Sequence, residues 1–213
     1  MHKKIHQPLA ALGLAAAFAA PLPASAASVV LYTFDDGLGG FVNQAESVAA
    51  NLGASAWSDA DGALTDLRGV SGDGRAVAAT SFDDGNTLAF TLNVAPGFRL
   101  ALDGYSFEEQ GSSGNRGLGP TSWSMSINGF GVAAGDAFIG NPGDTESGAL
   151  ALAGLTGDVL VEIFATGATA SDATWRIDTF SFDGAVSAVP VPPALLLAAP
   201  VLLGLAGRRR RAA

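Results

Sequence analysis

The 213-residue sequence contains no cysteine, and both histidines and both lysines lie within its first six residues. The region from residue 27 to 187 therefore contains no Cys, His or Lys. This absence excludes thiol nucleophiles, Ser-His-Asp triads, Schiff bases and histidine-ligated zinc from that region. It also means that no disulfide stabilises the chain.

Basic residues are scarce in the same central region. All 20 acidic residues lie within it, whereas six of the 11 lysines and arginines lie outside. The five basic residues that remain are Arg68, Arg75, Arg99, Arg116 and Arg176. Because such a surface repels phosphate groups, we expect no nucleic-acid partner. The charge suits divalent cations or neutral partners instead.

Residues 1–26 have the three parts of a secretory signal peptide. Residues 1–7 are basic, residues 9–20 are apolar, and Ala24-Ser25-Ala26 forms a small-residue cleavage motif. We therefore expect export by the Sec machinery and cleavage after Ala26. An uncleaved N-terminal anchor is the alternative.

Residues 188–213 combine a proline-rich hinge, an apolar segment and an arginine cluster. The hinge is Val189, Pro190, Val191, Pro192, Pro193 and Ala194, the apolar segment is 194–207, and the cluster is Arg208, Arg209, Arg210 and Arg211. As a helix, the apolar segment is roughly 21 Å long, which is short for a hydrocarbon core of roughly 30 Å. We expect a short transmembrane helix with its arginines in the cytoplasm, which places residues 27–187 on the periplasmic side of the inner membrane.

This tail resembles the C-terminal sorting signals of the PEP-CTERM class, and within it the VPLPA-CTERM variant of Gram-negative bacteria. The hinge here reads VPVPPA, so it differs from the variant at Val191 and Pro193. In that family an exosortase, a membrane-embedded cysteine transpeptidase, cuts near the hinge. The resemblance implies an exosortase partner, an inner-membrane stage and a final place at the cell surface or in the extracellular matrix. The alternative is a tail anchor that is never cut.

The central region has the residue pattern of β-strands. Residues 87–94 alternate apolar with polar or small side chains, and 29–34 is a β-branched and aromatic run that ends in an Asp-Asp-Gly turn. Residues 158–166 are nearly continuously apolar, which predicts a buried strand. The pattern predicts an all-β domain over 27–187, an antiparallel β-sandwich of jelly-roll type, flanked by the signal peptide and the transmembrane sorting helix.

Some stretches of this region are less regular. Residues 43–57 are compatible with one helical turn or a further strand, and 58–75 are expected to form a surface loop with at most one short strand. Asn128-Gly129 predicts a hairpin turn. Trp123 and Trp175 share strand faces with Met125 and Ile177 and are expected in the core.

Carboxylates are the remaining candidates for catalytic or metal-binding groups in this region. A glycosidase needs two acids that face each other, but Glu108 and Glu109 are neighbours in an expected strand and would point to opposite faces. We therefore predict that the protein is not an enzyme. Asp35, Asp36 and Asp178 loosely resemble the structural calcium site of many sandwich-type carbohydrate-binding modules. Turn formation and surface charge are the alternative role for these acids, and no other cofactor is expected.

A sugar site would need an exposed aromatic ring with polar groups beside it. The candidate ligands are Trp57, expected to be an exposed ring near a loop, and Arg116, in a glycine-rich loop. Two functional hypotheses follow. The first is a non-enzymatic surface or matrix protein with a structural or adhesive role. The alternative is a carbohydrate-binding module that contacts extracellular polysaccharide, or a carboxylate-dependent glycosidase.

Overall fold

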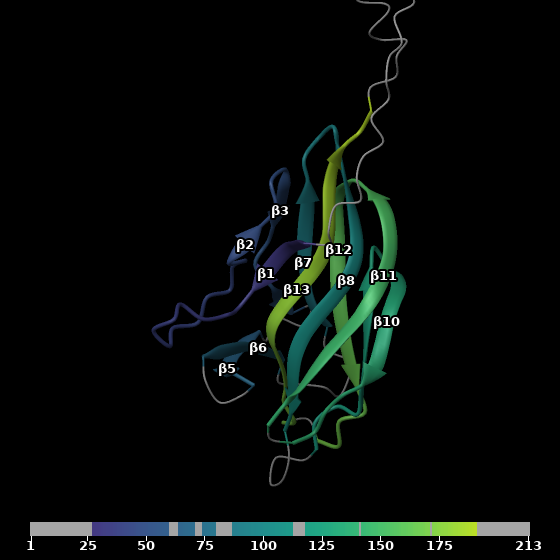
Figure 1. The fold of residues 1–213 in the computed structure, drawn as a ribbon. Coiled ribbons are helices and arrows are strands. Elements are labelled where there is room, and N and C mark those ends of the chain that lie inside the picture. Colours follow the sequence, from purple (N-terminus) through teal and green to yellow (C-terminus); the bar gives the residue numbers. More distant parts are fainter. Residues whose placement is uncertain are drawn as a thin grey trace, which may run out of the picture.

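The computed structural model describes residues 27–59, 64–70, 74–79, 87–112, 118–140, 142–170 and 172–190 (Figure 1). These residues form strands, turns and loops. They include no helix that is long and apolar enough to cross a membrane. The signal peptide, the expected helix 194–207 and Arg116 lie outside the described residues.

Two antiparallel sheets pack face to face as a β-sandwich. The first has the order β11-β8-β13-β1-β2, with β6 beside β13 and β5 beside β6. Its strands are β1 (Ala27–Tyr32), β2 (Ser47–Val48), β5 (Thr65–Arg68), β6 (Arg75–Ala79), β8 (Phe98–Gly111), β11 (Asp144–Leu155) and β13 (Trp175–Ala188). In Figure 1, β11, β8 and β13 run side by side along the length of the molecule.

The second sheet has the order β10-β9-β12-β7-β3, with β4 also paired to β7. Its strands are β3 (Leu52–Ala54), β4 (Ser58–Asp59), β7 (Thr87–Val94), β9 (Ser122–Ile127), β10 (Phe130–Asp136) and β12 (Gly157–Thr166). The prediction of an all-β antiparallel sandwich is confirmed. The expected turn at Asn128-Gly129 joins β9 to β10, and both residues have positive φ angles of 51° and 78°.

Aromatic side chains fill the space between the sheets. Trp57 packs against Phe90 and Phe180, with ring centroids 4.7 and 5.2 Å apart. Trp123 and Trp175 are 3% and 1% exposed, which confirms their expected place in the core. The interior is therefore filled by rings contributed by both sheets.

Several irregular stretches are more ordered than the sequence predicts. Residues 43–57 contain β2 and β3, so the alternative with a further strand is correct. Residues 58–75 contain β4, β5 and the first residue of β6, whereas the sequence predicts a loop with at most one short strand. The long strand β8 runs without a break through Asp103-Gly104, although its register with both partners, β11 and β13, shifts there.

Candidate functional site

The exposed side chains of β12 form the centre of one candidate site. Val159, Val161 and Ile163 point into the core and are 0% exposed, whereas Leu160 and Phe164 lie on the outer face at 39% and 36% exposure. The strand predicted from this nearly continuous apolar sequence is confirmed, but its predicted burial holds for one face only. Only one face of the strand meets the opposite sheet, so the other apolar side chains face solvent.

Polar side chains of neighbouring strands surround Phe164 on this face. Phe164 lies opposite Thr87 of β7 and Ser124 of β9, and Glu162 lies opposite Ser126 of β9. Together these five residues line a shallow depression of about 300 Å³, here called the sheet-face groove. Its floor consists of three hydrogen-bonded strands, β7, β12 and β9.

Glu162 is the charged group of the sheet-face groove. Its Oε2 accepts a hydrogen bond of 2.9 Å from the Ser126 hydroxyl. A carboxylate has several lone pairs, so Glu162 can accept further hydrogen bonds from hydroxyl groups of a ligand. The groove therefore combines an apolar ring with hydroxyl and carboxylate groups, the chemistry that contacts a sugar ring and its hydroxyls.

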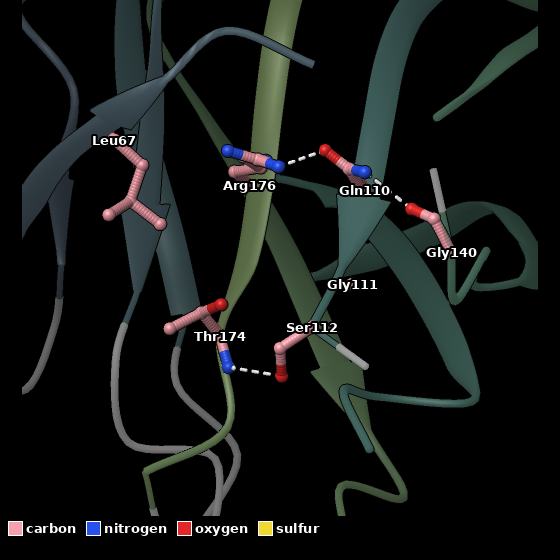
Figure 2. Close-up of a pocket in the computed structure, with 7 residues that line it drawn as sticks. All are labelled: Leu67, Gln110, Gly111, Ser112, Gly140, Thr174 and Arg176. Atoms are coloured by element: carbon pink, nitrogen blue, oxygen red, sulfur yellow. Dashed lines mark hydrogen bonds between the residues drawn. The ribbon is translucent and has the colours of Figure 1, made fainter. Parts of the chain in front are cut away.

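A second pocket lies on the other sheet and is lined by residues at one end of β8 and β13 together with Leu67 of β5. It has a volume of about 250 Å³ and is here called the arginine pocket. Its lining residues are Leu67, Gln110, Gly111, Ser112, Gly140, Thr174 and Arg176. Figure 2 shows the side chains of Arg176 and Gln110 facing each other, with Ser112 and Thr174 nearby.

Hydrogen bonds fix the polar groups of the arginine pocket. The Arg176 Nη2 donates to Gln110 Oε1, and the Gln110 amide in turn donates to the Gly140 carbonyl. On its other side, Arg176 Nη1 donates to the Arg68 carbonyl at 2.6 Å. The Thr174 amide donates to Ser112 Oγ at 3.0 Å. The guanidinium is thus held between two strands in one orientation.

Glu109 is a buried acid in the interior of the sandwich. It is 0% exposed, Oε1 accepts a 3.0 Å hydrogen bond from the Phe138 amide, and Oε2 accepts one from the Trp175 indole. Burial raises the pKa of Glu109 to about 7, although these two hydrogen bonds favour the ionised form. The side chain ties β8 to β13 and to the segment after β10.

Asp178 is a second buried acid, on the sheet face opposite to that of Glu109. It accepts hydrogen bonds from the amides of Val70 at 3.2 Å and Thr179 at 2.8 Å. Burial raises its pKa to about 6. Its cross-strand neighbour is Glu108, whereas Glu109 pairs with Ile177. Glu108 and Glu109 therefore do not converge, and Asp178 is covered by the segment that includes Val70, so these acids form no accessible catalytic pair.

The acids proposed for calcium have structural roles in the described fold. Asp35 Oδ1 accepts a hydrogen bond from the Gly37 amide, and Asp36 Oδ1 accepts from the amides of Leu38 and Gly40. With Asp178 bonded to two amides as well, all three carboxylates stabilise backbone turns and junctions. Among the described residues, no three acidic or histidine side chains are grouped closely enough to hold a metal ion.

The expectation that Trp57 is an exposed ring is wrong. It is 2% exposed, and its backbone forms two hydrogen bonds with the Asn43 side chain, at 2.8 and 2.9 Å. These bonds fix the residue just before β4, so that its ring enters the space between the sheets. A ring buried in this way cannot stack on a sugar.

Of the hinge residues, only Val189 and Pro190 are described. Strand β13 continues to Ala188, and the Val189 amide then donates a 2.8 Å hydrogen bond to the Gly97 carbonyl. The folded domain therefore continues up to the hinge without a spacer. The sorting role of the hinge and of Arg208 to Arg211 stays a prediction.

Neither candidate site was identified from the sequence. The sequence of β12 from Val159 to Ala165 is apolar on both faces except at Glu162, so it gives little indication that Phe164 faces solvent. No local signal pairs Gln110 with Arg176, because they are 66 residues apart and meet only through strand pairing.

No family model matches the chain, and no curated protein matches it. Among solved structures, it is similar to the CBM22-1 xylan-binding domain of Paenibacillus barcinonensis Xyn10C, with a TM-score of 0.47 and 11% identity over 79% of this chain and 98% of that one. It is also similar to the family 11 carbohydrate-binding module of Clostridium thermocellum, with a TM-score of 0.32 and 15% identity over 73% of this chain and 96% of that one. With TM-scores below 0.5, these similarities identify neither a family nor a ligand for this chain.

Proposed function

We propose that this chain is an exported, non-enzymatic β-sandwich protein that binds neutral polysaccharide through the sheet-face groove. The observation that carries the proposal is the solvent-exposed Phe164 ring, set among hydroxyl and carboxylate side chains on three paired strands. An apolar ring on a polar face offers a stacking surface for a sugar, and the surrounding groups can bind its hydroxyls. A jelly-roll-like chain path, the finer form of the expected fold, is part of this proposal.

The shape of the groove favours an extended ligand over a small molecule. It is shallow, it lies across β7, β12 and β9, and Leu160 continues the apolar surface along β12 beyond Glu162. A polysaccharide chain can lie across such a face and contact several residues at once. In a surface or matrix protein, this contact would provide the adhesive role.

Delivery to the cell exterior forms the second part of the proposal. In the sequence, the signal peptide 1–26 precedes and the hinge 189–194 follows the described sandwich, whose first strand begins at Ala27 and whose last strand ends at Ala188. Cleavage after Ala26 and near the hinge would leave every described strand in place. We propose that an exosortase-type transpeptidase releases the domain to the cell surface or matrix.

Glycan binding is tested with an array of neutral polysaccharides and a matched pair of variants. The protein purified from the producing cells should bind a subset of glycans, and Phe164→Ser should weaken that binding at least tenfold because the stacking ring is lost. Phe130→Ser is the control, since Phe130 is 77% exposed in the β9–β10 hairpin but outside the groove lining. A uniformly flat array, or an equal loss for both variants, would contradict the proposal.

A further inference from the structure

The arginine pocket has a charge unlike that of the rest of the domain. Arg176 is the one charged side chain among its described lining residues, in a region where acids outnumber arginines by 20 to five. A second arginine, Arg68, is close enough to act on it. Burial lowers the pKa of Arg176, Asp178 raises it, and Arg68 lowers it further. Arg68 is therefore near Arg176, although it is not among the residues that line the pocket.

The guanidinium of Arg176 is positioned for a ligand. Its bonds to Gln110 and to the Arg68 carbonyl use two of its five N–H donors. Of the ion pairs within 4 Å among the described residues, Arg75–Asp66 is the one that involves an arginine and a carboxylate, and Arg176 forms none. Asp178 faces it at longer range, and the carboxylate of Asp178 is already bonded to two backbone amides. The planar guanidinium of Arg176 is therefore held in place and keeps N–H donors for a ligand.

The chemistry that fits this guanidinium is a carboxylate, which arginine binds through two parallel hydrogen bonds. The other walls of the pocket suit a sugar. Leu67 provides an apolar wall, and Ser112 and Thr174 provide hydroxyl groups. At about 250 Å³ the pocket is smaller than the roughly 300–1,000 Å³ of pockets for drug-sized ligands, so it would take one sugar unit.

We propose that the arginine pocket binds a uronic-acid unit of an acidic polysaccharide, with the sugar carboxylate on Arg176. This site is separate from the sheet-face groove, because the two lie on different sheets. The inference does not depend on the neutral glycan ligand of the groove. A protein with both sites would contact two kinds of polysaccharide from opposite sides of the sandwich.

Calorimetric titration with trigalacturonate tests the proposal on protein purified from the producing cells. The wild-type protein should bind trigalacturonate, and Arg176→Gln should weaken this binding at least tenfold while leaving the affinity for a neutral array ligand unchanged. Arg99→Gln is the matched control, since Arg99 is an exposed arginine of β8 that bonds to Ser187 outside the pocket. Phe164→Ser should weaken binding of the neutral array ligand and leave the affinity for trigalacturonate unchanged. The two sites are therefore tested independently.

Two further measurements keep the test decisive. If Arg176→Gln does not fold, Arg176→Lys retains the charge without the planar guanidinium, and its affinity for trigalacturonate should still fall several-fold. In NMR titration of the wild-type protein, trigalacturonate should shift the amide signals of Gly111 and Thr174 rather than those of Ser124 and Phe164. The proposal would be overturned if a folded Arg176 variant bound trigalacturonate with unchanged affinity, or if the amide shifts were confined to β9 and β12. It would also be overturned if acetate competed with trigalacturonate as effectively as galacturonate does.

Discussion

Glu109 is a single residue whose ionisation bears on the stability of the whole sandwich. Its carboxyl lies in the interior, bonded to the Trp175 indole and the Phe138 amide, and burial raises its pKa to about 7. An unfolded chain exposes the same group to water, where it ionises near pH 4.5. Between these two pH values the folded protein holds a proton that the unfolded chain has lost. Rising pH therefore favours unfolding across this range.

We predict that the free energy of unfolding falls as the pH rises from about 4.5 to about 7. The contribution of Glu109 to this loss is roughly 3 kcal/mol at most, at about 1.4 kcal/mol per pH unit. Asp178, whose pKa is raised to about 6, adds a smaller loss in the same direction. Glu109→Gln should flatten the decline, because an amide does not ionise.

Urea unfolding of the wild-type protein, Glu109→Gln and Glu46→Gln at pH 5 and pH 8 measures this effect. Glu46 is exposed, so its variant should keep the wild-type difference between the two pH values. The Gln variant can be less stable at both values, since it loses a hydrogen-bond acceptor. The prediction concerns the difference, and an equal decline in the wild-type protein and Glu109→Gln would show that Glu109 is not its source.

At the scale of elements, the pairing of β8 with β13 holds the first sheet together. Both strands have 14 residues, and they pair from Trp175 opposite Gly111 to Ala188 opposite Phe98. The register shifts between Asp183 and Gly184. At this irregularity the backbones come so close that a Cβ on Gly184 would lie 2.1 Å from the Ala101 carbonyl oxygen. Glycine is required there for close approach of two backbones.

Gly184→Ala should therefore destabilise the protein by about 1 to 3 kcal/mol, because the contact is with backbone that cannot move without disturbing the strand pair. Gly131→Ala is the control. Gly131 is also a strand glycine, and no atom lies within 4 Å of the position where its Cβ would be built. Thermal or urea unfolding of both variants compares them. Equal stability of the two variants would mean that β8 and β13 can separate at little cost.

At the scale of the whole molecule, the two sheets present different outer surfaces. The outer face of the second sheet has the sheet-face groove, with its exposed Phe164 ring, and the first sheet has the arginine pocket. Between them lies a core of aromatic rings that fixes the position of both. The expected signal peptide precedes all strands of the sandwich in the sequence, and the expected sorting tail follows them. Their removal would therefore leave every described strand in place.

We predict that the mature protein begins near Ala27 and ends within the hinge 189–194. Intact mass of the protein recovered from membrane and extracellular fractions measures both ends. Replacing Pro190, Pro192 and Pro193 with Ala should retain the chain in the inner membrane, because the proposed exosortase would no longer recognise the hinge. Pro142→Ala, in a loop of the folded domain, serves as the control. Surface delivery of the triple variant would refute the role of the hinge.

The sequence by itself determined the class of the fold and much of its core. Alternation along a strand is a local property, so the strand at 87–94, the turn at Asn128-Gly129 and the buried Trp123 and Trp175 could be predicted. The absence of Cys, His and Lys from 27–187 likewise limited the possible chemistry without any structure.

The tertiary structure decided which faces are covered and which distant residues meet. Trp57 looked exposed beside a loop but is drawn between the sheets, and Phe164 looked buried within an apolar run but faces solvent. Gln110 and Arg176 become neighbours only when β8 pairs with β13. Burial and pairing of this kind depend on contacts between segments far apart in the chain, and the local pattern of side chains does not encode them.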